Sequence, residues 1–337
     1  LGIVFSNMHD DTIRELTANR TMGSVPYGGR YRLVDFALSS LVNSGVSTVG
    51  IITKSNYQSL MDHVGSGRDW DLSRKIGGLS ILPPFGNSLS NGIYSGDLEA
   101  LDGVMNYIRR APGSHVLLCD CDLVANIDYR AMMEAHLGRG ADVTMLYSRS
   151  DMPPARHIQP LVALNVGEEG RVQDILIART MDGEMDLYLN TLIIKKDLLD
   201  YLVKNAMSRD QTSLVRDVLQ KKAQSLRIYG YQFEGYYRRI ESMNSFFEGN
   251  MELLDAGVRR QLFPRNRPVY TKVRDEFPSR YAEGARVENS LLADGCLIEG
   301  EVTNSILFRG VHVEKGARVD HCILMQACRV GAGSQLD

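Results

Sequence analysis

The chain has 337 residues, which at about 150 residues per domain predicts two domains. Its 38 Lys and Arg residues nearly balance 41 Asp and Glu residues, and the net charge of −3 argues against a nucleic-acid-binding protein with a basic face. With 44% hydrophobic and 23% charged residues the composition is that of a folded globular protein, and no apolar run reaches the length of about 18 residues that a membrane span needs. We therefore expect a cytoplasmic protein with no nucleic-acid or membrane partner.

Short apolar runs alternate with helical patterns over residues 1–255, an order typical of an α/β domain. A glycine-bearing turn at residues 167–170 separates two alternating segments and predicts a β-hairpin. The expected strands are 2–6, 46–53, 116–121, 143–147, 161–166 and 171–177, and the expected helices are 36–44, 129–138, 196–205, 212–220 and 242–254.

Residues 256–280 differ from this pattern, because three prolines (Pro264, Pro268 and Pro278) interrupt a charged, aperiodic stretch. Such a stretch predicts a linker. Beyond it, residues 281–337 repeat themselves. Each copy places a valine three residues before a small Ser or Cys and two aliphatic residues, with the valines at 287, 302 and 319. This rhythm is typical of hexapeptide repeats and predicts a parallel β-helix, in which each turn buries its aliphatic face on the next.

The five cysteines are spread along the chain and form no CxxC pair. This spacing argues against a disulfide framework and against a zinc site. We expect reduced thiols that pack as small hydrophobic side chains.

The loop after the first strand is where a nucleotide-binding α/β domain places its glycine-rich turn. Residues 7–16 contain no glycine, and Asp10 and Asp11 stand side by side there. Because two carboxylates repel a polyphosphate, this loop argues against nucleotide binding.

Two further stretches carry candidate chemistry. In residues 26–36 a Gly28-Gly29 turn is followed by Arg30 and Arg32, which could hold an anion by forked hydrogen bonds or belong to an ordinary solvated loop. Asp120 and Asp122 end a predicted strand, where paired carboxylates suit Mg²⁺, but one of them could equally cap the following turn.

Several motifs together resemble the bacterial ADP-glucose pyrophosphorylase (glucose-1-phosphate adenylyltransferase) family. They are Pro26–Phe36, Asn43–Gly45, Gly65–Leu72, Leu82–Pro84, Phe233–Arg238, Asn289–Leu292 and Gly295–Gly300. The resemblance implies a Rossmann-like, mixed-sheet, GT-A-like nucleotidyltransferase domain at 1–255, a linker at 256–280 and a left-handed β-helix at 281–337. It also implies tetrameric assembly and the conversion of glucose 1-phosphate and ATP to ADP-glucose and pyrophosphate.

The catalytic motifs of that family are degraded in this chain. Residues 7–16 replace the glycine-rich loop, Met22 stands at the position of a phosphate-contacting lysine, and residues 177–179 replace a motif whose lysine holds the sugar phosphate. Arg239 stands where the family has a metal-binding aspartate. Nucleotidyl transfer depends on positioning and charge stabilisation, so catalysis should be very weak. We expect no catalytic residues and no metal site, with Asp122 as the retained remnant.

Two groups of the family's functional residues are retained in this chain. The substrate-pocket remnants implied by the resemblance are Tyr94, Gly96, Glu99, Asp120 and Asp122, and the candidates for binding an effector anion are Arg20, Arg30 and Arg32.

This pattern resembles the D-type, non-catalytic subunits of some bacterial enzymes of glycogen biosynthesis. The first hypothesis is therefore a regulatory pseudoenzyme that assembles with a catalytic subunit as a heterotetramer, with Mg²⁺ bound by the partner and no cofactor bound by this chain; it could also form a homo-oligomer. The rivals are a slow adenylyltransferase that holds Mg²⁺ on Asp122 and a module that senses a sugar phosphate or nucleotide.

Overall fold

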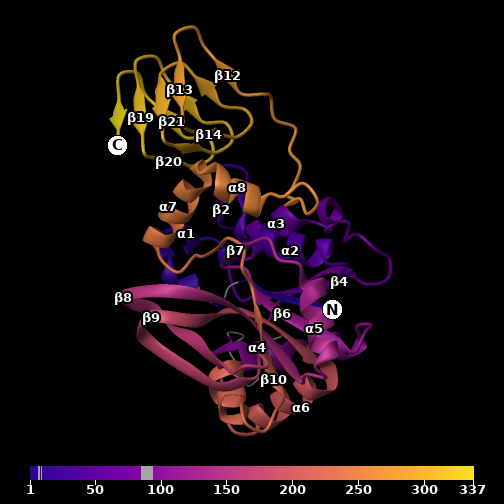
Figure 1. Cartoon of the computed structure of the whole chain (residues 1–337). Coiled ribbons are helices and arrows are strands. Elements are labelled where there is room, and N and C mark those ends of the chain that lie inside the picture. Colours follow the sequence, from indigo (N-terminus) through magenta and orange to yellow (C-terminus); the bar gives the residue numbers. More distant parts are fainter. Residues whose placement is uncertain (7, 9, 85–93) are drawn as a thin grey trace.

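The computed structural model describes residues 1–337 except 7, 9 and 85–93, and describes the backbone alone of 151–159. An α/β domain fills the N-terminal part, and a three-sided parallel β-helix forms the C-terminal part (Figure 1). Among the helices of the described residues, none has the length and apolar character needed to cross a membrane.

The α/β domain is built on a seven-stranded mixed sheet in the order β10-β8-β9-β6-β1-β4-β5. Strands β6, β1, β4 and β5 run parallel to one another, whereas β9 pairs antiparallel with both β6 and β8. The carboxyl ends of β1 and β6 therefore meet at one edge, which is where open α/β sheets bind ligands. The strands are β1 Gly2–Phe5, β4 Thr48–Ile52, β5 Gly78–Leu82, β6 His115–Asp120, β8 Val143–Val166, β9 Val172–Lys195 and β10 Ile228–Gln232.

Helices cover both faces of this sheet because its central strands are apolar on both sides. In β1, Val4 packs in a core cluster with residues of α2 (Leu33–Asn43). Its neighbours Ile3 and Phe5 point the other way and pack with α4 (Asp97–Arg110) and α6 (Lys196–Met207).

The remaining elements of the domain are short. They are η1 Asp10–Thr12, α1 Arg14–Thr17, η2 Met22–Ser24, β2 Pro26–Tyr27, β3 Tyr31–Arg32, α3 Gln58–Val64, η3 Arg68–Trp70, β7 Leu123–Ala125, α5 Tyr129–Gly138, η4 Leu214–Leu219, η5 Gln220–Lys222, β11 Tyr237–Arg239, α7 Met243–Met251, η6 Glu252–Leu254 and α8 Ala256–Leu262.

The predicted hairpin is present but is the tip of a much longer one. Strands β8 and β9 have 24 residues each and stay paired through several register shifts. The turn closes where Gly167 N donates to Arg171 O at 2.8 Å. The apolar run predicted a strand that stops at Tyr147, but pairing with β9 continues beyond it through Ser148, Arg149 and Ser150. Polar residues carry this extension, so the apolar pattern could not indicate it.

Two expected helices also differ in kind. The segment 212–220 is a π-helix, η4, followed by the short 3-10 helix η5. The segment 242–254 is α7, capped by the Ser242 side chain, and then the 3-10 turn η6. The first part of the predicted linker is helix α8, which begins after the Asp255 side chain accepts bonds from Gly257 N and Val258 N.

The rest of the linker forms no helix or strand up to β12, but it lies against the α/β domain. Asn126 Nδ2 donates to Leu262 O and Arg267 O at 3.0 and 2.8 Å. Tyr270 N donates to the Ser39 side chain on α2 at 2.8 Å. These bonds hold the segment in place even though its sequence has no periodic apolar pattern.

The β-helix stacks its strands in three parallel sheets, as the repeats predicted. Val287, Val302, Val319 and Leu336 lie in register in successive turns, which confirms the alignment of the repeats. The strands are β12 Arg280–Tyr281, β13 Arg286–Glu288, β14 Leu291–Leu292, β15 Leu297–Ile298, β16 Glu301–Thr303, β17 Ile306–Leu307, β18 His312–Val313, β19 Arg318–Asp320, β20 Ile323–Leu324, β21 Arg329–Val330 and β22 Gln335–Leu336.

The repeated Asn-Ser pairs make the corners between two of these sheets. Asn289 and Asn304 have positive φ values of 44° and 45°, a conformation that asparagine tolerates better than most residues. Ser305 N donates to the Ser290 hydroxyl at 3.1 Å, and Cys322 N donates to the Ser305 hydroxyl at 3.0 Å. The hydroxyls therefore join one turn to the next.

The two parts pack directly on each other. Ile306 and Phe308 of the β-helix are buried in the same core cluster as Leu33 and Phe36 of α2. The ring centroids of Phe247 on α7 and His321 on the β-helix are 5.1 Å apart. This contact places residues of both parts around a shared cavity.

Candidate functional site

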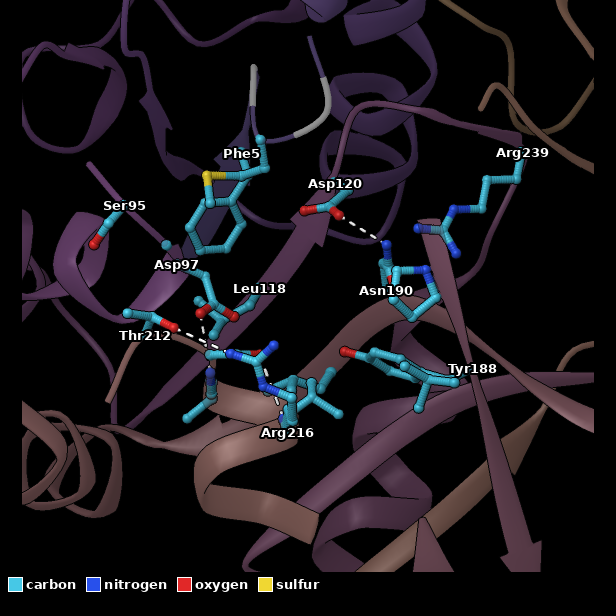
Figure 2. A pocket seen from close by; sticks show the side chains of 18 residues that line it. Phe5, Ser95, Asp97, Leu118, Asp120, Tyr188, Asn190, Thr212, Arg216 and Arg239 are labelled. Atoms are coloured by element: carbon cyan, nitrogen blue, oxygen red, sulfur yellow. Dashed lines mark hydrogen bonds between the residues drawn. The ribbon is translucent and has the colours of Figure 1, made fainter. Parts of the chain in front are cut away.

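A pocket of about 340 Å³ opens at the carboxyl ends of β1 and β6 (Figure 2); we call it the strand-end pocket. Strands β1, β6, β8 and β9, the start of α4 and the segment that leads into η4 all contribute to its wall. It is lined by Phe5, Met8, Ser95, Gly96, Asp97, Leu118, Asp120, Pro160, Val162, Tyr188, Asn190, Leu192, Thr212, Ser213, Leu214, Val215, Arg216 and Arg239.

Asp120, the last residue of β6, is oriented by the neighbouring strand β9. Asn190 Nδ2 donates to Asp120 Oδ2 at 2.9 Å, and Asn190 itself has a φ of 48°. Tyr188, two residues earlier, is buried, and this burial raises the pKa of its phenol well above the usual value. A carboxylate, an amide and a phenol thus face the cavity together, a set suited to binding hydroxyl groups.

Asp122 lies deeper and is paired with Arg239. Arg239 Nε is 3.4 Å from Asp122 Oδ2, and the two side chains are 16% and 3% exposed. Strand β11 pairs antiparallel with β7, which places Arg239 opposite Leu123, next to Asp122. Burial acts to lower the pKa of Arg239, but the carboxylates of Asp122, Glu241 and Asp120 raise it above the usual value. Arg239 is therefore a charged guanidinium.

The opposite wall is held by Asp97, at the first position of α4. Leu214 N donates to Asp97 Oδ1 at 2.9 Å, which fixes the start of the π-helix η4. Burial raises the pKa of Asp97 to about 6. Gly96 lets this segment approach closely, because a Cβ there would lie 2.2 Å from Thr212 O. π-helical turns occur frequently at functional sites.

The five predicted remnants are only partly brought together. Gly96 and Asp120 line the strand-end pocket, and Asp122 lies beneath it, in a small crevice with Asp120 and Met22. Tyr94 is a core residue, packed among the side chains on the α4 face of the sheet. Glu99 accepts bonds from Ser95 N and Oγ at 2.7 and 2.8 Å, and these bonds lower its pKa.

Besides three hydroxyl residues (Ser95, Thr212 and Ser213), the sequence reasoning missed four lining residues that carry a charge, an amide or a phenol: Asp97, Tyr188, Asn190 and Arg216. Asp97 lies between the predicted remnants Gly96 and Glu99 and could have been noticed from the charge it introduces. The other three lie far along the chain on β9 and η4, with no local signal.

The loop after β1 is arranged differently from a phosphate-binding turn. Asn7 and His9 lie outside the described residues. Asp10 Oδ1 accepts a bond from Met22 N at 2.7 Å, so a carboxylate occupies this backbone donor. Asp11 forms an exposed ion pair with Arg14 at 3.1 Å, and the Met22 side chain is buried.

A second pocket, of about 310 Å³, lies between the α/β domain and the β-helix; we call it the interdomain pocket. It brings together the three predicted effector candidates, Arg20, Arg30 and Arg32, and adds Arg274 from the linker and Arg309 from the β-helix. The lining residues are Glu15, Leu16, Arg20, Pro26, Gly29, Arg30, Tyr31, Arg32, Ser59, His63, Arg274, Phe308, Arg309, Met325 and Gln326.

Arg32 is the most firmly held of these arginines. Its Nη1 donates to Ser59 O and Ser59 Oγ at 2.5 and 2.9 Å, and its backbone N donates to Asp35 Oδ2 at 2.9 Å. Asp35 in turn meets His63 Nε2 at 2.6 Å. Burial, together with the charges of Arg20 and Arg274, lowers the pKa of Arg32 to about 10.

Arg309 is buried, with 7% of its surface exposed, and its Nε has no hydrogen-bond partner among the described residues. Burial and the charges of Arg30 and Arg274 lower its pKa. The cations of this pocket therefore repel one another. An anion bound among them would remove this repulsion and supply the missing hydrogen bond.

Comparison with known proteins agrees with both parts of the fold. Residues 11–176 match the nucleotidyl transferase family, and residues 277–337 match the GlmU-like C-terminal hexapeptide family, which confirms the predicted fold class of a nucleotidyltransferase domain followed by a left-handed β-helix.

Relatives that match nearly the whole chain include a glycogen biosynthesis protein and several adenylyltransferases. The chain is 31% identical over 322 residues to the glycogen biosynthesis protein GlgD of Bacillus subtilis, covering 95% of this chain and 82% of the relative. It is 33% identical over 321 residues to the glucose-1-phosphate adenylyltransferases of Bacillus mycoides and Bacillus cereus, covering 94% of this chain and 84% of each relative. The chain belongs to the bacterial ADP-glucose pyrophosphorylase (glucose-1-phosphate adenylyltransferase) family of glycogen biosynthesis.

Proposed function

We propose that this chain is a regulatory subunit that modulates a catalytic ADP-glucose pyrophosphorylase subunit and does not itself turn over substrate. The observation that carries the proposal is the Asp10–Met22 contact, in which a carboxylate of the loop after β1 accepts a hydrogen bond from the backbone N–H of Met22, the residue at the position of the family's phosphate-contacting lysine. Anions bind to free backbone N–H groups and to cations. The described part of this loop offers Asp10 and Asp11 instead.

The energetic consequence is large. Removing one group that stabilises developing charge typically lowers the rate by a factor of about 10²–10³. In this chain the uncharged, buried side chain of Met22 stands at the position of the family's phosphate-contacting lysine. Among the described residues, no cluster of three or more His, Cys, Asp or Glu side chains could hold a metal ion. Turnover of ATP and glucose 1-phosphate would then occur in a partner subunit, which would also bind the Mg²⁺.

The proposed assembly is a hetero-oligomer, taken as a tetramer, of this chain with a catalytic homologue. A relative named GlgD and relatives named as adenylyltransferases match this chain at similar identity, so two such chains share one fold and could share one interface.

Modulation is proposed to act through the interdomain pocket. Its five arginines come from the α/β domain, the linker and the β-helix. An anion that binds there would join the three segments. The α/β domain would then be held in one position relative to the β-helix.

The test is an activity assay of each subunit alone and of the two mixed. We expect essentially no ADP-glucose from this chain alone, and a higher rate or altered kinetics when it is added to a catalytic homologue that has the glycine-rich loop. The matched control adds this chain after heat denaturation. Robust turnover by the isolated chain would contradict the proposal. In the mixed enzyme, Asp122→Ala in this chain should leave the rate unchanged, whereas a slow adenylyltransferase that used Asp122 would lose activity.

A further inference from the structure

Arg239 has more hydrogen-bonding capacity than its surroundings use. Its backbone is fixed by the β11–β7 pairing and by the bond from Ile240 N to Asp122 O at 2.9 Å. Its one side-chain hydrogen bond within the described residues runs from Nε to Asp122 at 3.4 Å. Within that part of the chain both Nη atoms are left for the strand-end pocket, which Arg239 and Asn190 line together (Figure 2).

A divalent cation does not fit beside this group. The family implies a metal ion at the position of Asp122, but here that carboxylate faces a guanidinium that is 16% exposed. An arginine guanidinium is always protonated in proteins, so a metal ion at Asp122 would stand against a permanent positive charge at 3.4 Å from that carboxylate. Among the described residues there is also no cluster of three metal-ligating side chains.

We infer that Arg239 is a built-in cation in the place of the metal ion, and that the strand-end pocket binds a sugar monophosphate without any divalent metal. The inference rests on the proposed function, because it describes a pocket that holds such a ligand without transferring a nucleotide to it. The two Nη groups match two oxygens of one phosphate in the forked geometry that arginine favours.

The rest of the pocket restricts the ligand to this class. Asp120, Asn190 and Thr212 offer acceptors and donors for sugar hydroxyls. A nucleoside triphosphate would extend toward Asp10 and Asp11 of the loop after β1, where its charge is repelled. A sugar monophosphate carries its negative charge at one end only and avoids that loop.

The first experiment measures metal binding with Mn²⁺ as the probe, by electron paramagnetic resonance. We expect the full chain to bind no Mn²⁺ and Arg239→Asp to gain a site. A Mn²⁺ site in the unmodified chain that disappears in Asp122→Asn would overturn the inference. This readout is independent of activity, so it separates the inference from the proposed function.

The second experiment titrates glucose 1-phosphate by calorimetry, in EDTA and in Mg²⁺. The interdomain pocket could also take phosphate, so all titrations use the double variant Arg20→Met and Arg309→Met as background. We expect equal affinity in EDTA and Mg²⁺, and an affinity at least about tenfold lower in Arg239→Met. Arg280→Met is the matched control, since it removes an exposed arginine of β12 and should change nothing.

Removal of Arg239 takes a guanidinium away from the buried Asp122 carboxylate, so this variant could fail to fold. The double variant Arg239→Met with Asp122→Asn removes both charges of the pair. Circular dichroism would establish that it is folded. If this folded variant still binds glucose 1-phosphate as well as the background, or if binding requires Mg²⁺, the inference is wrong.

Discussion

The two pockets of this molecule have opposite charge arrangements. In the strand-end pocket each arginine meets a carboxylate: Arg239 lies 3.4 Å from Asp122, and Arg216 lies 3.2 Å from Asp217. In the interdomain pocket five arginines face a single lining acid, Glu15. The first pocket is neutralised from within, and the second is left with excess positive charge.

The pKa values of the arginines in the two pockets shift in opposite directions. Nearby carboxylates overcome burial and raise the pKa of Arg239, whereas burial and like charges lower the pKa of Arg309. The lowered pKa of Arg309 follows first from burial and then from the neighbouring charges of Arg30 and Arg274. This difference supports the proposal that the chain binds a regulatory anion in the interdomain pocket and does not itself turn over substrate in the strand-end pocket.

The largest expected effect tests the excess charge of the interdomain pocket. Arg20→Met combined with Arg309→Met should lower the affinity for fructose 1,6-bisphosphate, used as a two-phosphate probe, at least about 10²-fold, because each charge-assisted hydrogen bond contributes about 1.5–3 kcal/mol. Isothermal titration calorimetry would measure this affinity in the double variant and in the unmodified chain. Without ligand, thermal unfolding should show the same or a higher midpoint, since Arg20 repels Arg32 and Arg309 is repelled by Arg30 and Arg274. Unchanged affinity would mean that the arginines do not form an anion site.

The next effect concerns Asp97 in the strand-end pocket. Its pKa is raised from 3.8 to about 6 by burial, so the folded state holds this proton more tightly than the unfolded state. Its contribution to stability is therefore fully present below about pH 4 and is lost as the pH rises through about 6. At about 1.4 kcal/mol per pKa unit this amounts to at most about 3 kcal/mol.

Asp97→Asn removes this titration and can still accept the bond from Leu214 N. We expect its advantage over the unmodified chain, measured by urea unfolding, to grow between pH 4 and pH 7. Comparing the two proteins cancels groups of opposite sign, such as Asp142, whose pKa is lowered to about 2 by its hydrogen bond to Arg227. A difference that does not vary with pH would show that Asp97 is not the group responsible.

The fold was predictable where it depends on local patterns. Central strands such as β1 and β6 are buried on both faces, so their apolar runs indicate them, and the β-helix repeats because each turn stacks on one like it. The extension of β8 and β9 was not predictable, since its pairing continues through polar residues that have no such pattern.

The residues of the candidate sites also divide into those that the sequence predicted and those that only the structure revealed. Arg30 and Arg32 were noticed from the residues as a possible anion site, Arg20 and the effector role were added by the family resemblance, and the fold gathers all three into one pocket. The contacts of Asp97 with Leu214 and of Asp122 with Arg239 each join residues 117 positions apart. No periodicity or spacing indicates such a contact; only the folded sheet and the β11–β7 pairing produce it.

A smaller effect is expected at Gly96, on the wall of the strand-end pocket. A Cβ at this position would lie 2.2 Å from Thr212 O, so Gly96→Ala must push the segment before η4 outward. Overpacking of this kind typically costs about 1–3 kcal/mol, measurable by urea unfolding. Gly138→Ala is the control, because nothing lies within 4 Å of its added Cβ, and it should be neutral or stabilising. Equal free energies of unfolding for Gly96→Ala and Gly138→Ala would show that the segment before η4 shifts without loss of stability.

The smallest effect separates the two pockets by their response to salt. The screening length falls to about 8 Å at 0.15 M ionic strength, and it acts mainly on charges that solvent can reach. Arg30 is exposed at the interdomain pocket, whereas Arg239 is largely buried at the strand-end pocket. Raising NaCl from 25 to 300 mM should therefore weaken fructose 1,6-bisphosphate binding by about threefold or more, and glucose 1-phosphate binding by less. An equal salt response at both sites would show that the two pockets do not differ in the way their charges are neutralised.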